Sequence, residues 1–399
     1  MNPSAWALVI AAGGSTAPAP EPPQHSTPAI PTADLTEETR PRAAGSGEIL
    51  FINFDGAVLQ TGCGNDPHYD CSTLAGLFDG YVGPFGGNYA TRVNILQETR
   101  RDLADFDVTT VIERPPDDVD YTMVFYGDLG DQTFAGIAPY IDCEDGRGSD
   151  VSFTQGFVNG GTGSTVILQE AAHTWGLEHI DAPFDILNPF ATNSQSFQDE
   201  CFKIVANTDL ESTSGSCNQI HQQFCETGWQ NSYREMLLLF GPSSPDVEAP
   251  TLTITSPEDG STHVLPTTIA LLGEVTDNLD PQYYGVKIWD GDTMIFDEQQ
   301  VGLDLLLLNP PEGDYALRVE LTDTAQNVTE ASVEFTVLPE GSELPPTDDN
   351  EVDDEPESVG ACAVRPLGGP LLPRLGMLAL VVLAATRRRS ARDLRPRRC

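Results

Sequence analysis

Residues 169–179, Gln-Glu-Ala-Ala-His-Thr-Trp-Gly-Leu-Glu-His, constrain the fold of this 399-residue chain more than any other segment. On a helix, Gln169 and His173 are one turn apart and share a face, so both side chains can reach one ion. Gly176 permits the backbone turn that ends a helix, and this turn can bring His179 back to the same point. The segment therefore predicts a polar site at the end of one helix.

This segment resembles the zinc-protease signature H-E-x-x-H-x-x-G-x-x-H of the metzincin metalloproteases, with Gln169 where the family has its first histidine. The resemblance implies a zinc ion held by His173, His179 and Gln169. It also implies that Glu170 is the general base in peptide-bond hydrolysis, and that Gly176 makes the turn that ends the helix.

Two departures from the family's pattern bear on this prediction. A neutral amide oxygen is a poorer zinc donor than an imidazole nitrogen, so Gln169 implies weaker metal binding or none. Residues 185–189, Asp-Ile-Leu-Asn-Pro, are similar to the family's Met-turn, with Leu187 in place of methionine. Methionine is not a ligand in that family and leucine fills a similar volume, so this departure matters less. His68 or His221 is an alternative source of the missing ligand.

Two functions compete for this chain. The first is a cell-surface zinc metalloendopeptidase with a weakened site, which cleaves polypeptide substrates. The second is a catalytically inactive metzincin homologue that binds a surface protein, with Glu170, His173 and His179 hydrogen-bonded to one another without a metal. A third alternative is a plain disulfide-rich surface protein in which the motif is accidental.

The order of elements before the motif predicts an α+β metzincin-like domain over residues 47–241, with a mixed twisted sheet and an active-site helix. We expect an extended substrate to lie along a short edge strand at 134–141. The other predicted strands are 48–54, 108–112, 121–126 and 151–157, and the predicted helices are 89–105, 233–240 and one that runs from about Ser164 through the motif.

Residues 249–338 predict an all-β sandwich that resembles bacterial immunoglobulin-like modules, because short alternating stretches are separated by turns at regular intervals. Asp277, Asp280 and Asp323 are candidate calcium ligands, and the alternative is that they are solvated loop residues. The expected strands include residues 252–254, 269–271, 286–288, 317–321 and 333–337.

The net charge of -41 argues against nucleic acid or anionic lipid as a partner of the folded part. Eight cysteines without a CxxC pair indicate disulfides in an oxidising compartment rather than a zinc ribbon. Local pairs, Cys63 with Cys71 and Cys217 with Cys225, are the simplest predictions among many possible connectivities.

The two ends predict export and surface attachment. Residues 1–12 are a possible weak signal segment, residues 13–46 a disordered linker, and residues 339–359 an acidic stalk. Residues 360–399 hold a short apolar helix followed by arginines, and resemble a myxobacterial C-terminal sorting signal with Cys362 in its motif. The resemblance implies attachment at the cell surface, and the alternative is a plain tail anchor. Membrane contact is expected only through this segment.

Overall fold

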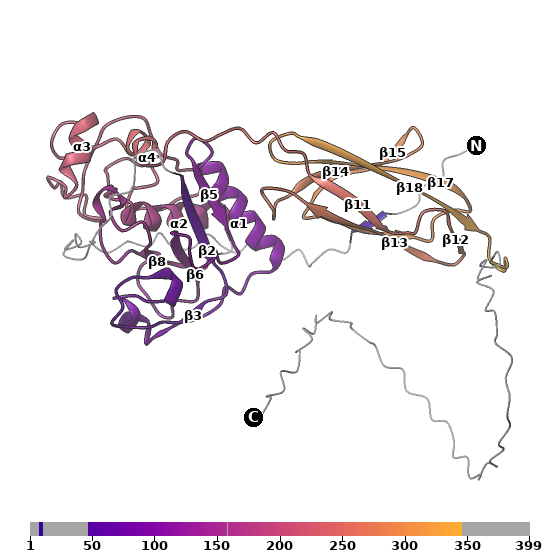
Figure 1. The fold of residues 1–399 in the computed structure, drawn as a ribbon, viewed down its shortest axis with the longest axis horizontal. Coiled ribbons are helices and arrows are strands. Elements are labelled where there is room, and N and C mark those ends of the chain that lie inside the picture. Colours follow the sequence, from indigo (N-terminus) through magenta and orange to yellow (C-terminus); the bar gives the residue numbers. More distant parts are fainter. Residues whose placement is uncertain (1–7, 11–46, 158, 345–399) are drawn as a thin grey trace, which may run out of the picture. The chain divides into compact units, whose positions relative to one another are not determined.

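The computed structural model describes residues 8–10, 47–157 and 159–344 (Figure 1). No helix among these residues is long and apolar enough to cross a membrane. The predictions that lie outside the described residues are the linker 13–46, most of the stalk 339–359 and the segment 360–399 with Cys362.

The first folded region is built on a five-stranded sheet with the strand order β5-β2-β6-β8-β7. Neighbouring strands are parallel except β7, which lies at the edge and is antiparallel to β8. All five strands were predicted from the sequence, and the structure confirms a mixed sheet. The strands are β2 (Glu48–Asn53), β5 (Val108–Val111), β6 (Thr122–Gly127), β7 (Gly136–Ile137) and β8 (Val151–Gln155).

Side chains of the central strands alternate between two apolar layers. Leu50 and Val124 belong to the core cluster that contains the motif helix, whereas Phe51 and Phe125 belong to a separate cluster on the opposite face. Both faces are buried, which explains why these strands read as nearly continuous apolar runs. The sheet can therefore hold the motif helix against a rigid support.

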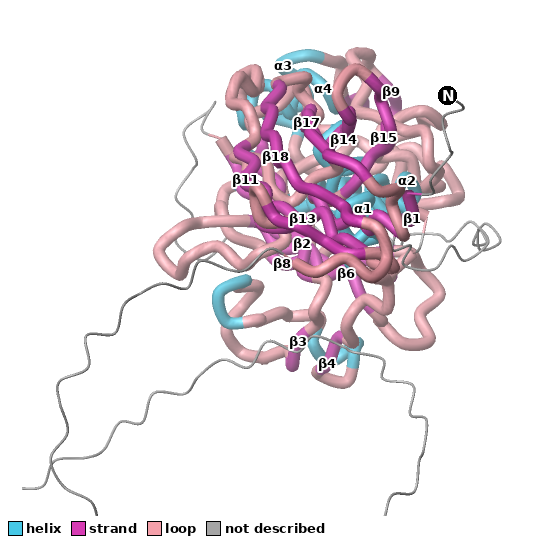
Figure 2. Tube along the Cα trace, turned by 90° about the vertical axis from the view of Figure 1, so that its right-hand side faces the viewer, coloured by secondary structure: helices cyan, strands magenta, loops and turns pink. Residues whose placement is uncertain are grey.

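Helices α1 (Tyr89–Asp102) and α2 (Gly160–Thr174) pack against each other and against the sheet. Figure 2 shows the short strands β3 (Ala57–Val58) and β4 (Tyr81–Val82) side by side, where they pair antiparallel. Smaller elements complete the region: η1 (Pro67–Tyr69), η2 (Ala75–Phe78), η3 (Cys143–Asp145), β9 (Phe202–Lys203), α3 (Asn218–Phe224), β10 (Trp229–Gln230) and α4 (Ser232–Phe240).

The motif helix begins four residues earlier than predicted, at Gly160 rather than near Ser164. Asn159 caps it, because its side-chain oxygen accepts a hydrogen bond from the Thr162 amide at 3.3 Å. Glycine in this first turn is a packing requirement: a Cβ at Gly163 would lie 2.3 Å from the Tyr126 hydroxyl. A glycine run that reads as a loop is therefore the first turn of a helix that fits closely against the sheet.

Three disulfides link the described cysteines, and one of the two predicted local pairs is correct. Cys63 bonds Cys71 as expected, but Cys217 bonds Cys143 rather than Cys225. Cys225 instead pairs with Cys201. The prediction failed because the fold brings η3 and the loop before α3 together, although 74 residues separate the two cysteines.

The second folded region is a β-sandwich, as the alternating pattern predicted. One sheet has the order β1-β16-β13-β11 and the other β12-β18-β17-β14-β15, and alternating side chains from both fill a single core. Three strands were not predicted: β12, β15 and β16. The strands are β11 (Thr251–Ser256), β12 (Ser261–Val264), β13 (Thr268–Thr276), β14 (Tyr284–Asp290), β15 (Thr293–Gln300), β16 (Leu303–Leu308), β17 (Gly313–Thr322) and β18 (Val328–Leu338).

An additional strand, β1 (Leu8–Ile10), pairs antiparallel with β16 at the edge of the first sheet. The sequence analysis placed these residues in a possible signal segment and did not foresee this pairing. The signal segment stays a prediction.

Candidate metal site

Trp175 and Gly176 fix the C-terminal end of α2 through their contacts with distant segments. The indole N–H of Trp175 donates to the Thr122 hydroxyl on β6 at 2.9 Å, and the ring contacts Phe240 edge to face. Gly176 follows with φ +100°, and a Cβ there would lie 2.8 Å from the Asp142 carbonyl oxygen. Only glycine suits both the left-handed backbone and the close approach. The predicted turn after the helix is confirmed.

This turn brings His173 and His179 together, as the motif predicted. Their Nε2 atoms are 3.1 Å apart, and the ring centroids are 4.6 Å apart. His173 is fully buried and His179 is 4% exposed. Two imidazoles from the helix and from the segment after it therefore converge on one point.

The opposite side of each ring faces a backbone carbonyl. His173 Nδ1 lies 2.8 Å from the Leu177 oxygen, and His179 Nδ1 lies 3.5 Å from the Ala206 oxygen, at the long end of the hydrogen-bonding range. A carbonyl oxygen only accepts, so the shorter contact places the N–H of a neutral His173 ring at Nδ1 and leaves its Nε2 as an acceptor. His179 Nε2 either donates a hydrogen bond to this acceptor or, with its own N–H at Nδ1, offers a second lone pair to a cation.

Neither His173 nor His179 is protonated near neutral pH. Burial lowers the pKa of His173 well below its usual value, and the neighbouring His179 lowers it further. Burial also lowers the pKa of His179, to about 4. Both rings are therefore neutral at pH 7, the state in which an imidazole nitrogen can bind a metal.

The spacing of the two nitrogens fits a zinc ion. Zn–N bonds of about 2.0–2.1 Å at a tetrahedral angle place two imidazole nitrogens roughly 3.3 Å apart, close to the observed separation. Each ligating histidine usually donates its other N–H to a carbonyl or carboxylate, and the same arrangement occurs here. The histidine pair thus has the ligand type and the separation that zinc requires.

Gln169 lies fully buried one turn before His173. Its amide N–H groups donate to the Ile186 carbonyl at 3.0 Å and to the Asn188 carbonyl at 2.7 Å. Its Oε1 atom is buried and has no hydrogen-bond partner. The amide is therefore oriented by the neighbouring turn, and its oxygen is left as a potential ligand.

The turn that orients Gln169 is the segment similar to a Met-turn. Leu187 is fully buried. Its amide N–H donates to the Asp185 carboxylate at 2.9 Å, and its carbonyl accepts from the Ile180 amide at 3.1 Å. Burial raises the pKa of Asp185 to about 6. The turn thus packs beside the motif with leucine as an apolar filler, as the sequence analysis expected.

Glu170 is the second buried group without partners. It is fully buried, and neither carboxylate oxygen has a hydrogen-bond partner. Burial raises the pKa of Glu170 well above its usual value, and the nearby Ala138 backbone opposes this only in part. The side chain lies against β7, because a Cβ at Gly136 would be 2.6 Å from Glu170 Oε1. The metal-free alternative is therefore wrong for Glu170, which bonds neither histidine, although His173 and His179 do lie within hydrogen-bonding distance of each other.

Neither alternative ligand reaches the histidine pair. His68 Nδ1 is 3.0 Å from Asp66, and its Nε2 is 3.0 Å from the Val119 carbonyl. His221 has Glu235 at 2.9 Å on one nitrogen and Glu178 at 3.3 Å on the other. Both rings already use both nitrogens elsewhere, so replacement by either histidine is excluded.

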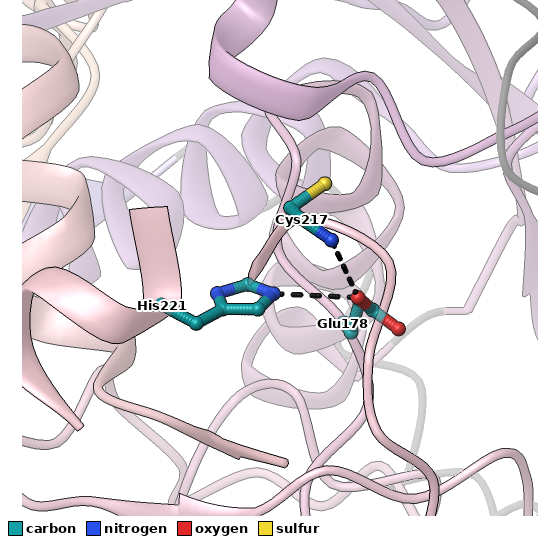
Figure 3. Close-up of side chains that lie close together, drawn as sticks. All are labelled: Glu178, Cys217 and His221. Carbon is teal, nitrogen blue, oxygen red and sulfur yellow. Dashed lines mark hydrogen bonds and ion pairs between the residues drawn. The ribbon is translucent and has the colours of Figure 1, made fainter. Parts of the chain in front are cut away.

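A second group of potential ligands, Glu178, Cys217 and His221, lies close together (Figure 3). Cys217 is bonded to Cys143 and has no thiolate to offer a metal. Burial would lower the pKa of His221, but Glu178 and Glu235 outweigh it and raise this pKa to about 9. The group is therefore a protonated histidine between glutamates rather than a metal site.

The two glutamates respond differently to the same cation. Burial would raise the pKa of Glu178, but His221 and the amides of Ser216 and Cys217 hold it below its usual value. At Glu235 burial outweighs the effect of His221, so its pKa is raised. Glu178 is accordingly the fully ionised partner of His221, and sequence reasoning gave no signal for this cluster.

A cavity of about 270 Å³ opens beside the histidine pair. Neither Gln169 nor Glu170 lines it. Among the described residues its walls are Ile141, His173, Glu178, His179, Val205, Ala206, Thr213, Ser214, Gly215 and Ser216.

The acidic residues of the sandwich form part of a loop network. Asp280 accepts from the Asp277 amide at 2.8 Å, and Asp323 accepts from Asn327 at 2.9 Å. The Oδ2 atoms of Asp277 and of Asp246, which the sequence analysis did not consider, are buried without a partner. Among the described residues these acids do not bring three ligand atoms within metal-binding distance of one another. Calcium binding here stays a prediction.

No family model and no curated protein matches this chain. Solved structures give partial matches. The fibronectin(III)-like modules of Clostridium thermocellum CbhA match with 20% identity over 22% of this chain and 94% of theirs, at a TM-score of 0.20. The PKD1 domain of Vibrio anguillarum Epp matches with 14% identity over 25% of this chain and 100% of its own, at a TM-score of 0.18. At these scores the matches assign no function.

Proposed function

We propose that residues 47–241 form a metzincin-type zinc endopeptidase domain in which His173, His179 and the Gln169 amide oxygen hold the metal. The observation that carries this proposal is the 3.1 Å approach of the Nε2 atoms of two neutral, buried imidazoles. The unpartnered Oε1 of Gln169 adds a further buried acceptor. A buried excess of acceptors without donors favours a bound cation.

Each residue has a separate role in this proposal. Zinc, when bound, supplies Lewis-acid activation of water and of the scissile carbonyl. Glu170, kept ionised by the charge of a bound metal, would accept the proton of the attacking water and pass it to the leaving amine. The short edge strand β7, which lies over Glu170, offers its backbone to an extended polypeptide.

Gln169 makes this a weakened site. Its amide oxygen is a poorer donor to zinc than an imidazole, so we expect lower metal affinity than three histidines would give. The two hydrogen bonds to the turn that contains Leu187 offset part of this loss, because they hold the amide in one orientation.

Metal analysis of the full chain tests the proposal. The expected result is close to one zinc per chain at micromolar metal, together with cleavage of casein. His173→Ala should abolish both, whereas the matched variant His263→Ala, in the β-sandwich, should change neither. A full chain that binds no zinc under these conditions would rule the proposal out.

A surface binding protein with an inactive site is the second candidate. The observation that favours it is the complete burial of Glu170, which lies outside the lining of the neighbouring cavity. A folded chain that cleaves no polypeptide, whether or not zinc binds, would select this candidate.

We propose that the protein is exported. Three disulfides among the described residues support an oxidising compartment. Attachment at the cell surface through residues 360–399 and Cys362 remains part of the proposal, and labelling of intact cells with an antibody against the β-sandwich tests it.

A further inference from the structure

The cavity beside the histidine pair has two chemically distinct walls. Ile141, Val205 and Ala206 form an apolar wall, and the segment 213–216 forms a wall of small polar residues next to Glu178. Its volume of about 270 Å³ is slightly smaller than the roughly 300–1,000 Å³ of pockets that enclose a whole small ligand. The space suits one long side chain of a bound polypeptide.

Glu178 uses only one of its two carboxylate oxygens within the fold. Oε1 accepts from the Cys217 amide at 3.2 Å, from the Ser216 amide, and from His221 at 3.3 Å. No described residue donates to Oε2, which is not among the buried unpartnered atoms. In Figure 3 the second oxygen points away from His221. One half of the carboxylate is therefore fixed, and the other half is available to a ligand.

The wall that carries this carboxylate is held in place from two sides. The disulfide between Cys143 and Cys217 ties the segment 213–217 to η3. His221 on α3 holds Glu178 from behind, and Glu235 on α4 holds His221 in turn. A carboxylate fixed in this way loses little conformational freedom when it binds a cationic group, which favours specific recognition.

We propose that this cavity receives a lysine or arginine side chain of the polypeptide and pairs its charged end with Glu178 Oε2. The aliphatic stem packs on Ile141, Val205 and Ala206, as the stems of basic residues do on apolar surface. No lysine or arginine is among the described residues that line the cavity, and a chain with net charge -41 attracts cationic polypeptides. This inference rests on the proposed function, because it assigns a substrate class to the same site.

Cleavage profiling with the zinc-loaded full chain tests the inference. A peptide mixture is digested, and the residues that flank each cleaved bond are counted. We expect lysine or arginine to be preferred about tenfold at one position, which is the size of a charge-assisted hydrogen bond. Glu178→Gln should reduce the preference to about twofold or less, and the matched variant Glu226→Gln, at an exposed site outside the cavity, should retain it.

Ser214→Lys is a second variant that keeps the test valid if Glu178→Gln does not fold. Ser214 is an exposed residue of the cavity wall, so a lysine there places a competing cation in the cavity without disturbing the core. It should abolish the preference for basic residues. A preference that survives both substitutions, or a wild-type chain without any preference, would overturn the inference.

Fluorescence anisotropy separates this inference from the proposed function. It compares binding of a lysine-containing peptide with that of the same peptide carrying methionine. Tighter binding of the lysine peptide that is lost in Glu178→Gln supports the cavity assignment, even if no peptide is cleaved, in which case the peptidase proposal alone fails. Equal binding of both peptides, combined with cleavage, overturns the cavity assignment alone.

Discussion

Two buried histidine clusters in the same domain have opposite electrostatic designs. His173 and His179 face each other with both Nδ1 atoms directed at carbonyls, and burial lowers the pKa of both rings. His221 lies between Glu178 and Glu235, and these carboxylates raise its pKa to about 9. The same side chain is thus neutral in one place and is itself a cation in the other. The difference lies in the partners, because carbonyls fix a tautomer whereas carboxylates stabilise a charge.

The largest effect is expected at Glu170. Glu170→Gln should lower kcat/KM for peptide cleavage by about 10²–10⁴-fold, because it removes the group that accepts the proton. Zinc stoichiometry should not change, because the ligands remain. Peptidase assays beside metal analysis check this result, and Glu226→Gln is the control. Undiminished cleavage by the Glu170 variant would show that this carboxylate is not the base.

The cluster of Glu178, His221 and Glu235 should lose stability when one of its glutamates is replaced. Glu235→Gln leaves His221 with one carboxylate and should lower the free energy of unfolding by about 3 kcal/mol, as expected when a buried ion pair loses one partner. Urea unfolding of the full chain measures the change. Zinc binding at His173 and His179 should stay as in the wild type. A joint loss of stability and zinc affinity would indicate that the two clusters are not independent.

The stability of the same cluster should fall at alkaline pH. The folded-state pKa of His221, about 9, lies above its ordinary value of 6.5. Its contribution is therefore complete below about pH 6.5, declines as the pH rises, and is lost once the pH passes about 9. Urea midpoints measured from about pH 6 to about pH 10 should fall in the wild type and much less in Glu235→Gln. Equal slopes for the two proteins would contradict the assignment of a charged His221.

A histidine at position 169, as in the metzincin signature, should make the pair of His173 and His179 a stronger zinc site. Gln169→His replaces an amide oxygen by an imidazole nitrogen and should tighten zinc binding by about tenfold or more, equivalent to about 1.4 kcal/mol. Competition with a chromogenic chelator measures the affinity. His68→Gln, at the histidine that the structure places elsewhere, is the control and should leave it unchanged. If the Gln169 variant bound zinc no better than the wild type, the amide would not face the metal.

The smallest effect concerns the acidic loops of the β-sandwich. Burial and the charges of Asp323, Asp246 and Asp280 raise the pKa of Asp277. In a calcium-free buffer Asp277→Asn should therefore stabilise the sandwich, by a few tenths of a kcal/mol after allowance for solvent screening. Thermal unfolding with and without calcium measures this change. If calcium binds at these loops, Asp277→Asn should destabilise the sandwich once calcium is added. A variant that stabilises it equally with and without calcium would show that the predicted calcium site is wrong.

The sequence by itself determined the local features on which the site depends. The four-residue spacing fixed Gln169 and His173 on one face of a helix, and Gly176 supplied a backbone turn that other residues resist. Alternating and continuous apolar runs located the five strands of the sheet and most strands of the sandwich, because burial on one or two faces leaves a period in the chain.

Only the tertiary structure decided which distant residues each of these side chains contacts. The start of the helix at Gly160, the pairing of Cys143 with Cys217 and the contacts of Gln169 with the turn around Leu187 all depend on segments that approach one another in space. The cluster of Glu178, His221 and Glu235 leaves no local pattern, because its members come from three separate segments. Local spacing therefore identified which residues could act, whereas long-range packing set their tautomers, charges and partners.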